Sequence, residues 1–296
     1  MSTPEKPTPP QIEKAAQPEN LPPAVSDVAE QTREAVQNIH GAKLFASEDN
    51  ARQFLKDHIP PKENDRQVDL APLKEQLFEI PENLAPGHYE FEGKNGFRVS
   101  FDLVSADSDF DRCGLLYKDA EGIEGDYRPI FVIKNLQIRT NNFSYDEKEL
   151  SRPVGITWLP KLRSAKTELT SVVAYRGNQR DVHLMGEDGW HARPINLLGL
   201  FHELGHSETR SPEDQRKEEN SVSTIITGKG VKTEPFKKAA LELQRELDAN
   251  SWMLQRAGKL FDDLGISREL IEDYIEHKQM RSYYEANRRR LAQSTE

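Results

Sequence analysis

Two histidines four residues apart, His202 and His206, constrain this chain more than any other feature of its sequence. The segment reads Phe-His-Glu-Leu-Gly-His, so a carboxylate, Glu203, directly follows the first histidine. In a helix, residues four apart return to nearly the same face, so both imidazoles can bind one metal ion while Glu203 lies beside an open coordination position. The spacing therefore predicts a helix that carries a metal site with room for water.

The residues around this motif favour a helix over 194–207. Pro194 suits the first helical turn, and the two glycines of the run lower helix propensity but allow close packing. Apolar residues occur on both sides of the stripe that carries the histidines: Ile195, Leu197, Leu198, Phe201 and Leu204. We therefore expect a buried helix. Two core histidines bonded to backbone groups are the alternative, and a third ligand would argue against that alternative.

A second predicted helix, over 235–258, offers the third ligand. Glu246 and Asn250 project from within its apolar stripe, whereas Asp248 lies opposite and Glu242 lies at the edge. A carboxylate is rarely buried unless it is paired or bound to a metal, so we expect Glu246 to be the third ligand. We expect Asn250 to support one histidine through a hydrogen bond. Pairing of Glu246 with a buried Arg or Lys is the alternative.

Two enzyme families that contain the same His-Glu-x-x-His pattern do not fit. Metzincins need Gly at position 209 and His at position 212, where this chain has Thr209 and Pro212. Peptide deformylases use an upstream cysteine ligand, but the single cysteine, Cys113, lies in the unlike context Asp-Arg-Cys-Gly-Leu-Leu. A carboxylate from a later helix remains as the third ligand.

Taken together, the two motifs resemble those of the ImmA/IrrE-like metallopeptidases, a compact branch of the gluzincins. The segment 246–253 is similar to the family pattern Glu-x-x-Ala-Asn-x-Phe-Ala, with Trp252-Met253 in place of Phe-Ala. The resemblance covers the helical part of the chain only. It implies hydrolysis of peptide bonds in a protein or peptide substrate. It also implies Zn2+ ligation by His202, His206 and Glu246, a general base at Glu203 and a supporting polar group at Asn250.

The sequence leaves two functional questions open. An oxyanion donor can come from any of several side chains: His183, His191, Tyr274, Tyr283 or Tyr284. The alternative function is that of a catalytically inactive zincin-fold protein with an interaction or regulatory role. Glu203 argues against it, because a structural zinc site usually has four protein ligands and needs no carboxylate beside an open position.

The rest of the chain predicts an α+β protein with a polar tail. Residues 1–23 are rich in Pro, Glu, Lys and Gln and predict a disordered tail, and residues 24–84 predict peripheral helices, most clearly over 47–58. Alternation of apolar and polar residues predicts strands between 87 and 185, among them segments at 114–117, 129–139 and 154–159. Turn signals at Lys94-Asn95-Gly96 and Gly177-Asn178 predict two antiparallel hairpins.

The predicted strands lead into the helices that carry the metal site. Residues 207–235 are highly polar and predict a loop, and residues from 267 to 291 predict further helices. We therefore expect one zincin-like metallopeptidase domain over residues 85–296. Zincins commonly bind substrate along a strand that precedes the metal helix, so we expect the second hairpin to form the cleft wall. An ordinary core hairpin is the alternative.

Composition limits the partners and the compartment. A formal net charge of −10 disfavours a nucleic-acid-binding surface, and the cluster Arg288-Arg289-Arg290 is more simply a solvated helix face. One cysteine excludes an intramolecular disulfide and fits a reducing compartment. The N-terminus lacks an apolar signal-peptide region, and no stretch approaches the ~18 apolar residues of a membrane span. We therefore expect a soluble cytoplasmic protein without membrane or nucleic-acid partners.

Overall fold

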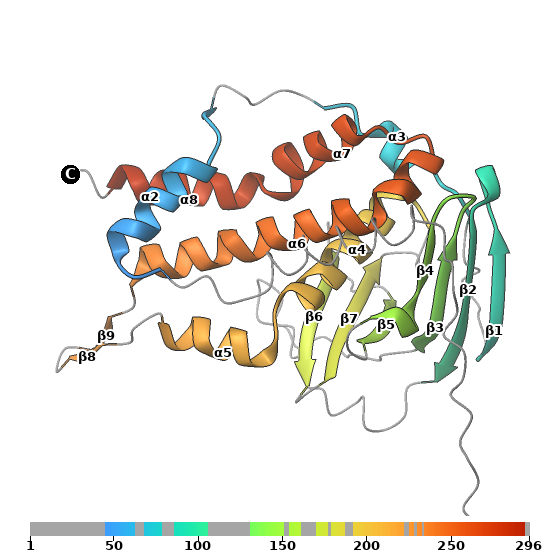
Figure 1. Ribbon diagram of the computed structural model, residues 1–296, viewed down its shortest axis with the longest axis horizontal. Helices are drawn as coiled ribbons and strands as arrows, with labels where there is room; N and C mark the ends of the chain where they lie inside the picture. Colours follow the sequence, from blue (N-terminus) through green and yellow to red (C-terminus); the bar gives the residue numbers. More distant parts are fainter. Residues whose placement is uncertain are drawn as a thin grey trace, which may run out of the picture.

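The computed structural model combines a β-sheet with helices that cover one of its faces (Figure 1). The predicted tail over 1–23, the chain up to residue 44 and the strand predicted at 114–117 lie outside the described residues. The structure describes residues 45–62, 68–78, 86–105, 131–150, 154–160, 170–176, 179–186, 192–221, 225–227, 230–232 and 234–293.

Seven strands of the described chain form one mixed sheet in the order β1-β2-β3-β5-β7-β6, and β4 pairs with β3. Both predicted hairpins are present, as the antiparallel pairs β1–β2 and β6–β7. The parallel pairing of β5 with β7 was not predicted, and β4 was missed because three residues are too few to reveal alternation. The strands are β1 Gly87–Glu92, β2 Arg98–Ser105, β3 Phe131–Arg139, β4 Ser144–Asp146, β5 Val154–Pro160, β6 Thr170–Arg176 and β7 Gln179–Gly186.

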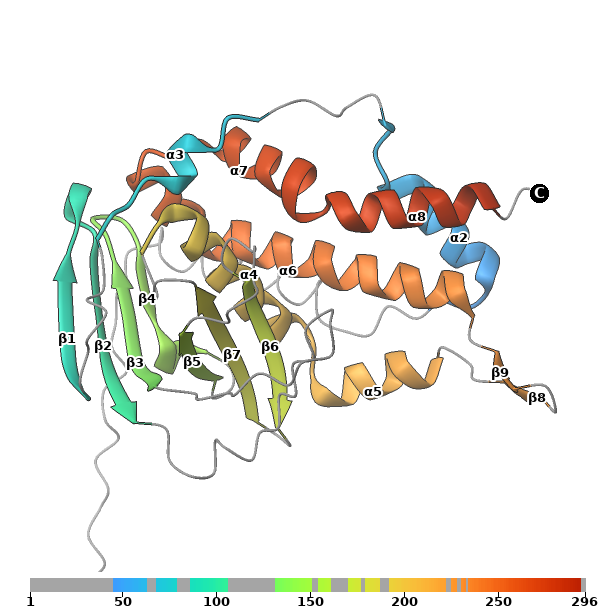
Figure 2. The same cartoon turned by 180° about the vertical axis from the view of Figure 1, so that it is seen from behind.

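The helices lie in layers above this sheet (Figures 1 and 2). Helix α4 packs on β6 and β7, α6 packs on α4, and α2 packs on α6. The ring of Phe201 of α4 contacts the ring of Tyr145 of β4 edge-on, with centroids 5.3 Å apart, so α4 is anchored in the core of the sheet. The main helices are α2 Glu48–His58, α3 Ala71–Lys74, α4 Pro194–Thr209, α5 Pro212–Ser221, α6 Pro235–Asp263, α7 Arg268–Tyr274 and α8 Arg281–Gln293.

The predicted loop over 207–235 is wrong in part, because α5 and the short hairpin of β8 (Ile225–Thr227) and β9 (Gly230–Lys232) lie within it. Ser211 starts α5: its hydroxyl accepts the backbone N–H of Asp214 at 2.9 Å. Glu218 of α5 is fully buried and accepts from Arg210 and Arg245, both at 2.8 Å. The polar composition of this segment therefore reflects capping and buried ion pairs as well as solvation.

The predicted boundary at 258 is also wrong, because α6 continues to Asp263. Leu260 and Phe261 extend its buried apolar stripe beyond Gly258. Gly265, two residues past the end of the helix, adopts a φ of 74°. There the N–H of Ile266 donates to Phe261 O and that of Gly265 donates to Asp262 O, which is the Schellman arrangement.

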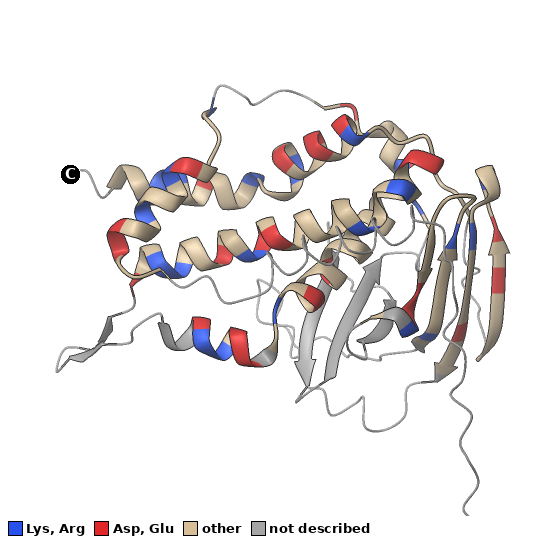
Figure 3. Cartoon of the chain, in the orientation of Figure 1, with Lys and Arg blue, Asp and Glu red and all other residues tan. Residues whose placement is uncertain are grey.

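The C-terminal residues form helices as predicted, interrupted by an unpredicted π-helical turn over Ile275–Gln279. Arginines of the 288–290 cluster make contacts within the fold. Arg288 donates to the carbonyl of Pro60 at 2.6 Å, and Arg290 donates to Asn287. Acidic and basic residues are interspersed along α6 and α8 (Figure 3). None of the described helices combines the length and apolar character that a bilayer crossing requires.

Gly205 sets the distance between the two helices of the predicted metal site. A Cβ atom at Gly205 would lie 2.6 Å from the carbonyl oxygen of Ala249 and 3.0 Å from its Cα. Those atoms belong to the backbone of α6 and cannot rotate away. The glycine therefore allows α4 and α6 the close approach on which the site depends.

We expect Gly205→Ala to destabilise the protein by about 1–3 kcal/mol, because the added methyl group has to push α4 and α6 apart. Thermal or urea unfolding measures this effect. Gly258→Ala is the matched control, since a Cβ there meets nothing within 4 Å. That change should stabilise α6 by up to about 1 kcal/mol. Equal stabilities of the two variants would contradict the close-approach argument.

Candidate metal centre

His202 and His206 on α4 and Glu246 on α6 bring their donor atoms together. The two Nε2 atoms are 3.1 Å apart. His202 Nε2 lies 3.3 Å from Glu246 Oε2, and His206 Nε2 lies 3.5 Å from Glu246 Oε1. Within the described part of the chain, this is the one group of three His, Cys, Asp or Glu side chains whose ligand atoms lie close enough to hold a metal ion.

The spacing of these atoms fits a single small cation. With bonds of about 2.0–2.1 Å, ligand atoms of a tetrahedral zinc site are roughly 3.3–3.4 Å apart. The observed separations of 3.1, 3.3 and 3.5 Å lie around that value. Two imidazoles and a carboxylate suit several divalent metals, zinc among them, and three protein ligands leave a further coordination position for water.

The three side chains are largely removed from solvent. Their exposed fractions are 7% for His202, 18% for His206 and 14% for Glu246. Burial by itself raises the pKa of Glu246, but hydrogen bonds and charge from the two histidines outweigh burial and hold this pKa well below its usual range. The carboxylate is therefore ionised at neutral pH and contributes the negative charge that attracts a cation.

The two imidazoles respond to each other and to this carboxylate. Burial lowers the pKa of His206, and the charge of His202 lowers it further. Burial also disfavours protonation of His202, but Glu246, Glu203 and Asn250 outweigh that effect and raise its pKa. At 3.1 Å, the gap between the two Nε2 atoms holds at most one proton, and a bound metal ion would displace that proton.

Asn250 fixes the orientation of His202. The Nδ1–H of His202 donates to Asn250 Oδ1 at 2.9 Å, and both side chains are buried. The amide group of Asn250 is held in turn, because its Nδ2 donates to the sulfur of Met280 at 3.5 Å. Because the proton of His202 is on Nδ1, its Nε2 has a free lone pair, and this atom lies next to His206 Nε2 and Glu246 Oε2. Asn250 therefore lies where the sequence predicts a supporting group.

We expect Asn250→Ala to weaken metal binding by roughly ten- to a hundredfold, because loss of such a supporting bond leaves the ring of His202 free to turn. Competition for Zn2+ with a chromophoric chelator measures the affinity. Asn287→Ala is the control, since both asparagines are 4% exposed and Asn287 bonds Arg290 instead. An affinity equal to that of the parent would make Asn250 an ordinary buried polar residue.

The acidic residues of α6 point in different directions, as the helical spacing predicts. Among the described residues, the carboxylate of Glu246 contacts His202, His206 and Tyr283 and no Arg or Lys, which disfavours the ion-pair alternative. Asp248 pairs with Arg210 instead. Glu242 is 46% exposed, with Lys238 at 3.9 Å. Of the carboxylates on α6, Glu246 alone belongs to the three-residue group with His202 and His206.

Glu203 is half-buried beside the cluster and is not one of the three donors. Its charge contributes to the raised pKa of His202 and to that of Tyr283. Burial is the main cause that raises the pKa of Tyr283, and the charges of Glu246, Glu242 and Glu203 raise this pKa further.

Of the five proposed oxyanion donors, Tyr283 alone among the described side chains contacts the three-donor group. Its hydroxyl donates to Glu246 Oε1 at 3.1 Å. Tyr274 packs against the main core, which is the apolar cluster between the sheet, α4 and α6. Tyr284 belongs to the second core, a separate apolar cluster that includes Phe54 and Leu55 of α2. The side chains of His183 and His191 lie outside the described residues. No sequence pattern distinguishes Tyr283 from the other candidates, because its position on the helix face depends on the π-helical turn before α8.

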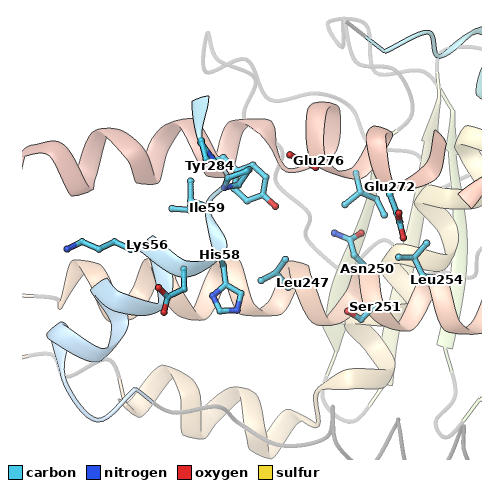
Figure 4. Close-up of a pocket in the computed structure, with 14 residues that line it drawn as sticks. Lys56, His58, Ile59, Leu247, Asn250, Ser251, Leu254, Glu272, Glu276 and Tyr284 are labelled. Carbon is cyan, nitrogen blue, oxygen red and sulfur yellow. The ribbon is translucent and has the colours of Figure 1, made fainter. Parts of the chain in front are cut away.

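A cavity of about 610 Å³ borders Asn250 and lies between α2, α6 and the helical segments over 268–293 (Figure 4). Its wall includes Ile59, Leu247, Asn250, Glu276 and Tyr284, and it includes none of the three donors or Glu203. The cavity therefore adjoins the residue that supports His202 and is separate from the metal-facing side of the cluster.

The sequence and fold were compared with protein-family models, curated proteins and solved structures, and none of them matches this chain.

Proposed function

We propose that the chain is a zinc-dependent peptidase of the gluzincin type, with His202, His206 and Glu246 as the ligands. The convergence of these three donors beside Glu203, which is not a donor, is the observation that carries the proposal. When bound, zinc supplies Lewis acidity that activates water and polarises a peptide carbonyl group. A site that only stabilises the fold would be expected to have a fourth protein ligand.

In this proposal, the residues divide the chemical work. Glu203 accepts a proton from the attacking water and returns it to the departing amine nitrogen, so the same carboxyl group serves as base and then as acid. Asn250 keeps the proton of His202 on Nδ1 throughout. The pKa of Glu246 is depressed, so this carboxylate stays ionised while Glu203 changes its protonation state. Two carboxylates in different surroundings thereby take different roles.

The proposed substrate is an extended protein or peptide segment that pairs with β6. Among the described strands, β6 lies at the edge of the sheet, and α4 packs against it. An outer strand offers backbone N–H and C=O groups that an added strand can pair with. A segment bound along β6 would lie next to the metal helix, which is the zincin-like arrangement that we propose for this fold.

Replacement of Glu203 by Gln tests the proposal. Gln keeps the size and hydrogen-bonding capacity of the side chain but cannot act as a base. Hydrolysis should fall by about 10²–10⁴-fold while the metal content stays that of the parent. Unchanged cleavage by the Glu203→Gln protein would remove Glu203 from the mechanism.

A further inference from the structure

The start of α8 and the residue before it contact two α6 residues of the site, Glu246 and Asn250. Tyr283 donates its hydroxyl to Glu246 Oε1 at 3.1 Å, and Met280 accepts from Asn250 Nδ2 at 3.5 Å. Glu246 and Asn250 are one turn apart on α6. Met280, which follows the π-helical turn, and Tyr283 of α8 are nearly one turn apart. The pairs run in opposite directions along the two helices, so one face of α8 matches one face of α6.

The π-helical turn over Ile275–Gln279 sets this face. Its last hydrogen bond runs from the N–H of Met280 to the carbonyl of Ile275 at 2.8 Å, which is a five-residue spacing. A π-helical turn inserts one residue into the helical register and so rotates everything after it by about a quarter turn or more. This rotation brings Met280 into contact with Asn250 and Tyr283 into contact with Glu246.

The hydroxyl of Tyr283 acts on the part of Glu246 that is least fixed by its backbone. The last torsion of a Glu side chain has no sharp preference, so a carboxylate rotates readily unless neighbours hold it. In the structure, Oε1 accepts from Tyr283 and faces His206, while Oε2 faces His202. One hydrogen bond at Oε1 therefore orients both oxygens toward the imidazoles.

We propose that Tyr283 is a positioning residue whose hydroxyl holds the Glu246 carboxylate in the orientation that binds metal. This inference rests on the proposed metal site and needs no peptidase activity. The π-helical turn is the structural device that brings the hydroxyl there. Removal of the hydroxyl leaves the three ligands in place and lets the carboxylate turn, so metal binding weakens without loss of the fold.

Tyr283→Phe tests this inference through Zn2+ affinity and the visible spectrum of bound Co2+, and neither readout needs a substrate. We expect roughly a ten- to a hundredfold loss of Zn2+ affinity and a changed Co2+ absorption band, because the coordinating carboxylate is no longer fixed. Tyr284→Phe is the matched control: it removes the same atom from the next residue, which is packed in the second core. The control should equal the parent in both readouts.

A double-substitution cycle with Glu246→Gln shows whether Tyr283 acts through Glu246. If it does, Tyr283→Phe should lower affinity much less in the Glu246→Gln background than in the parent. Circular dichroism and the melting temperature of the metal-free proteins check that each variant is folded. An equal loss in both backgrounds would mean a general packing effect and would overturn the inference.

The remaining outcomes separate this inference from the proposed metal site. If the parent binds Zn2+ and Co2+ while Tyr283→Phe matches it in affinity and spectrum, the role of Tyr283 is refuted and the site stands. If the parent binds neither metal, both fall together. A loss of peptide hydrolysis with unchanged affinity and spectrum would also overturn the positioning role, since the hydroxyl would then act on the substrate.

Discussion

Alanine in place of His202, His206 or Glu246 is expected to abolish stoichiometric metal binding. The parent protein should bind about one zinc ion per chain, and each variant should bind close to none, because two remaining ligands make a poor site. The three donors are at most 18% exposed and lie 3.1–3.5 Å apart, so water cannot readily replace a missing side chain in the same position. Metal analysis of the purified proteins measures the result.

Unfolding gives a second measure of the same effect. A ligand at a hundred times its dissociation constant stabilises the folded state by about 2.7 kcal/mol, which raises the melting temperature by several degrees. Added Zn2+ should therefore raise the melting temperature of the parent and leave that of the three variants unchanged. Glu242→Ala is the control, because Glu242 lies one turn before Glu246 on the same helix and is 46% exposed.

The two measurements and the Glu242→Ala control can each contradict the ligand assignment. Zinc retained at one ion per chain in Glu246→Ala would exclude that residue from the ligand set. If Glu242→Ala lost the metal instead, Glu242 rather than Glu246 would be the third ligand. Loss of metal in all four variants would indicate that the helix pair, rather than a particular side chain, is being disturbed.

The sequence was sufficient to place the three donors because both helices are long and strongly periodic. On α4, the spacing of four residues puts His202 and His206 on one face by geometry alone. On α6, Glu246 and Asn250 interrupt an apolar stripe, and buried polar groups of that kind need partners. Each inference uses one helix at a time. Their agreement in space follows from Gly205, which lets the backbones of α4 and α6 approach closely.

Several contacts between different helices and strands could not be predicted from the sequence, because they depend on residues far apart in the chain. Glu218 is buried because Arg210, just past the end of α4, and Arg245 of α6 converge on it, and no local pattern in a polar segment reveals that convergence. Tyr283 meets Glu246 because a π-helical turn shifts the phase of α8, and a regular helical wheel does not contain that shift. The parallel pairing of β5 with β7 likewise cannot be foreseen from the alternation of apolar and polar residues within either strand, because alternation does not specify the neighbouring strand.

The Glu203→Gln protein is expected to keep its metal and lose hydrolysis. Glu203 is not one of the three donors, and Gln has nearly the same shape, so zinc content and melting temperature should match those of the parent. Loss of the base should slow hydrolysis by about 10²–10⁴-fold. Glu242→Gln is the charge-matched control, since its carboxylate also acts on Tyr283 but lies outside the three-donor group.

The comparison is best made in the host cell, because the natural substrate is then present. A peptidase that still binds substrate but cannot cleave it should retain intact partners, so Glu203→Gln protein should recover full-length proteins that the parent recovers only as fragments or not at all. The Glu242→Gln protein should behave as the parent does. If the parent and Glu203→Gln proteins recover the same uncut partners in equal amounts, the peptidase proposal fails. The metal-binding helices would then serve a protein that binds its partner without cutting it, and Glu203 would have no chemical role that distinguishes it from Gln.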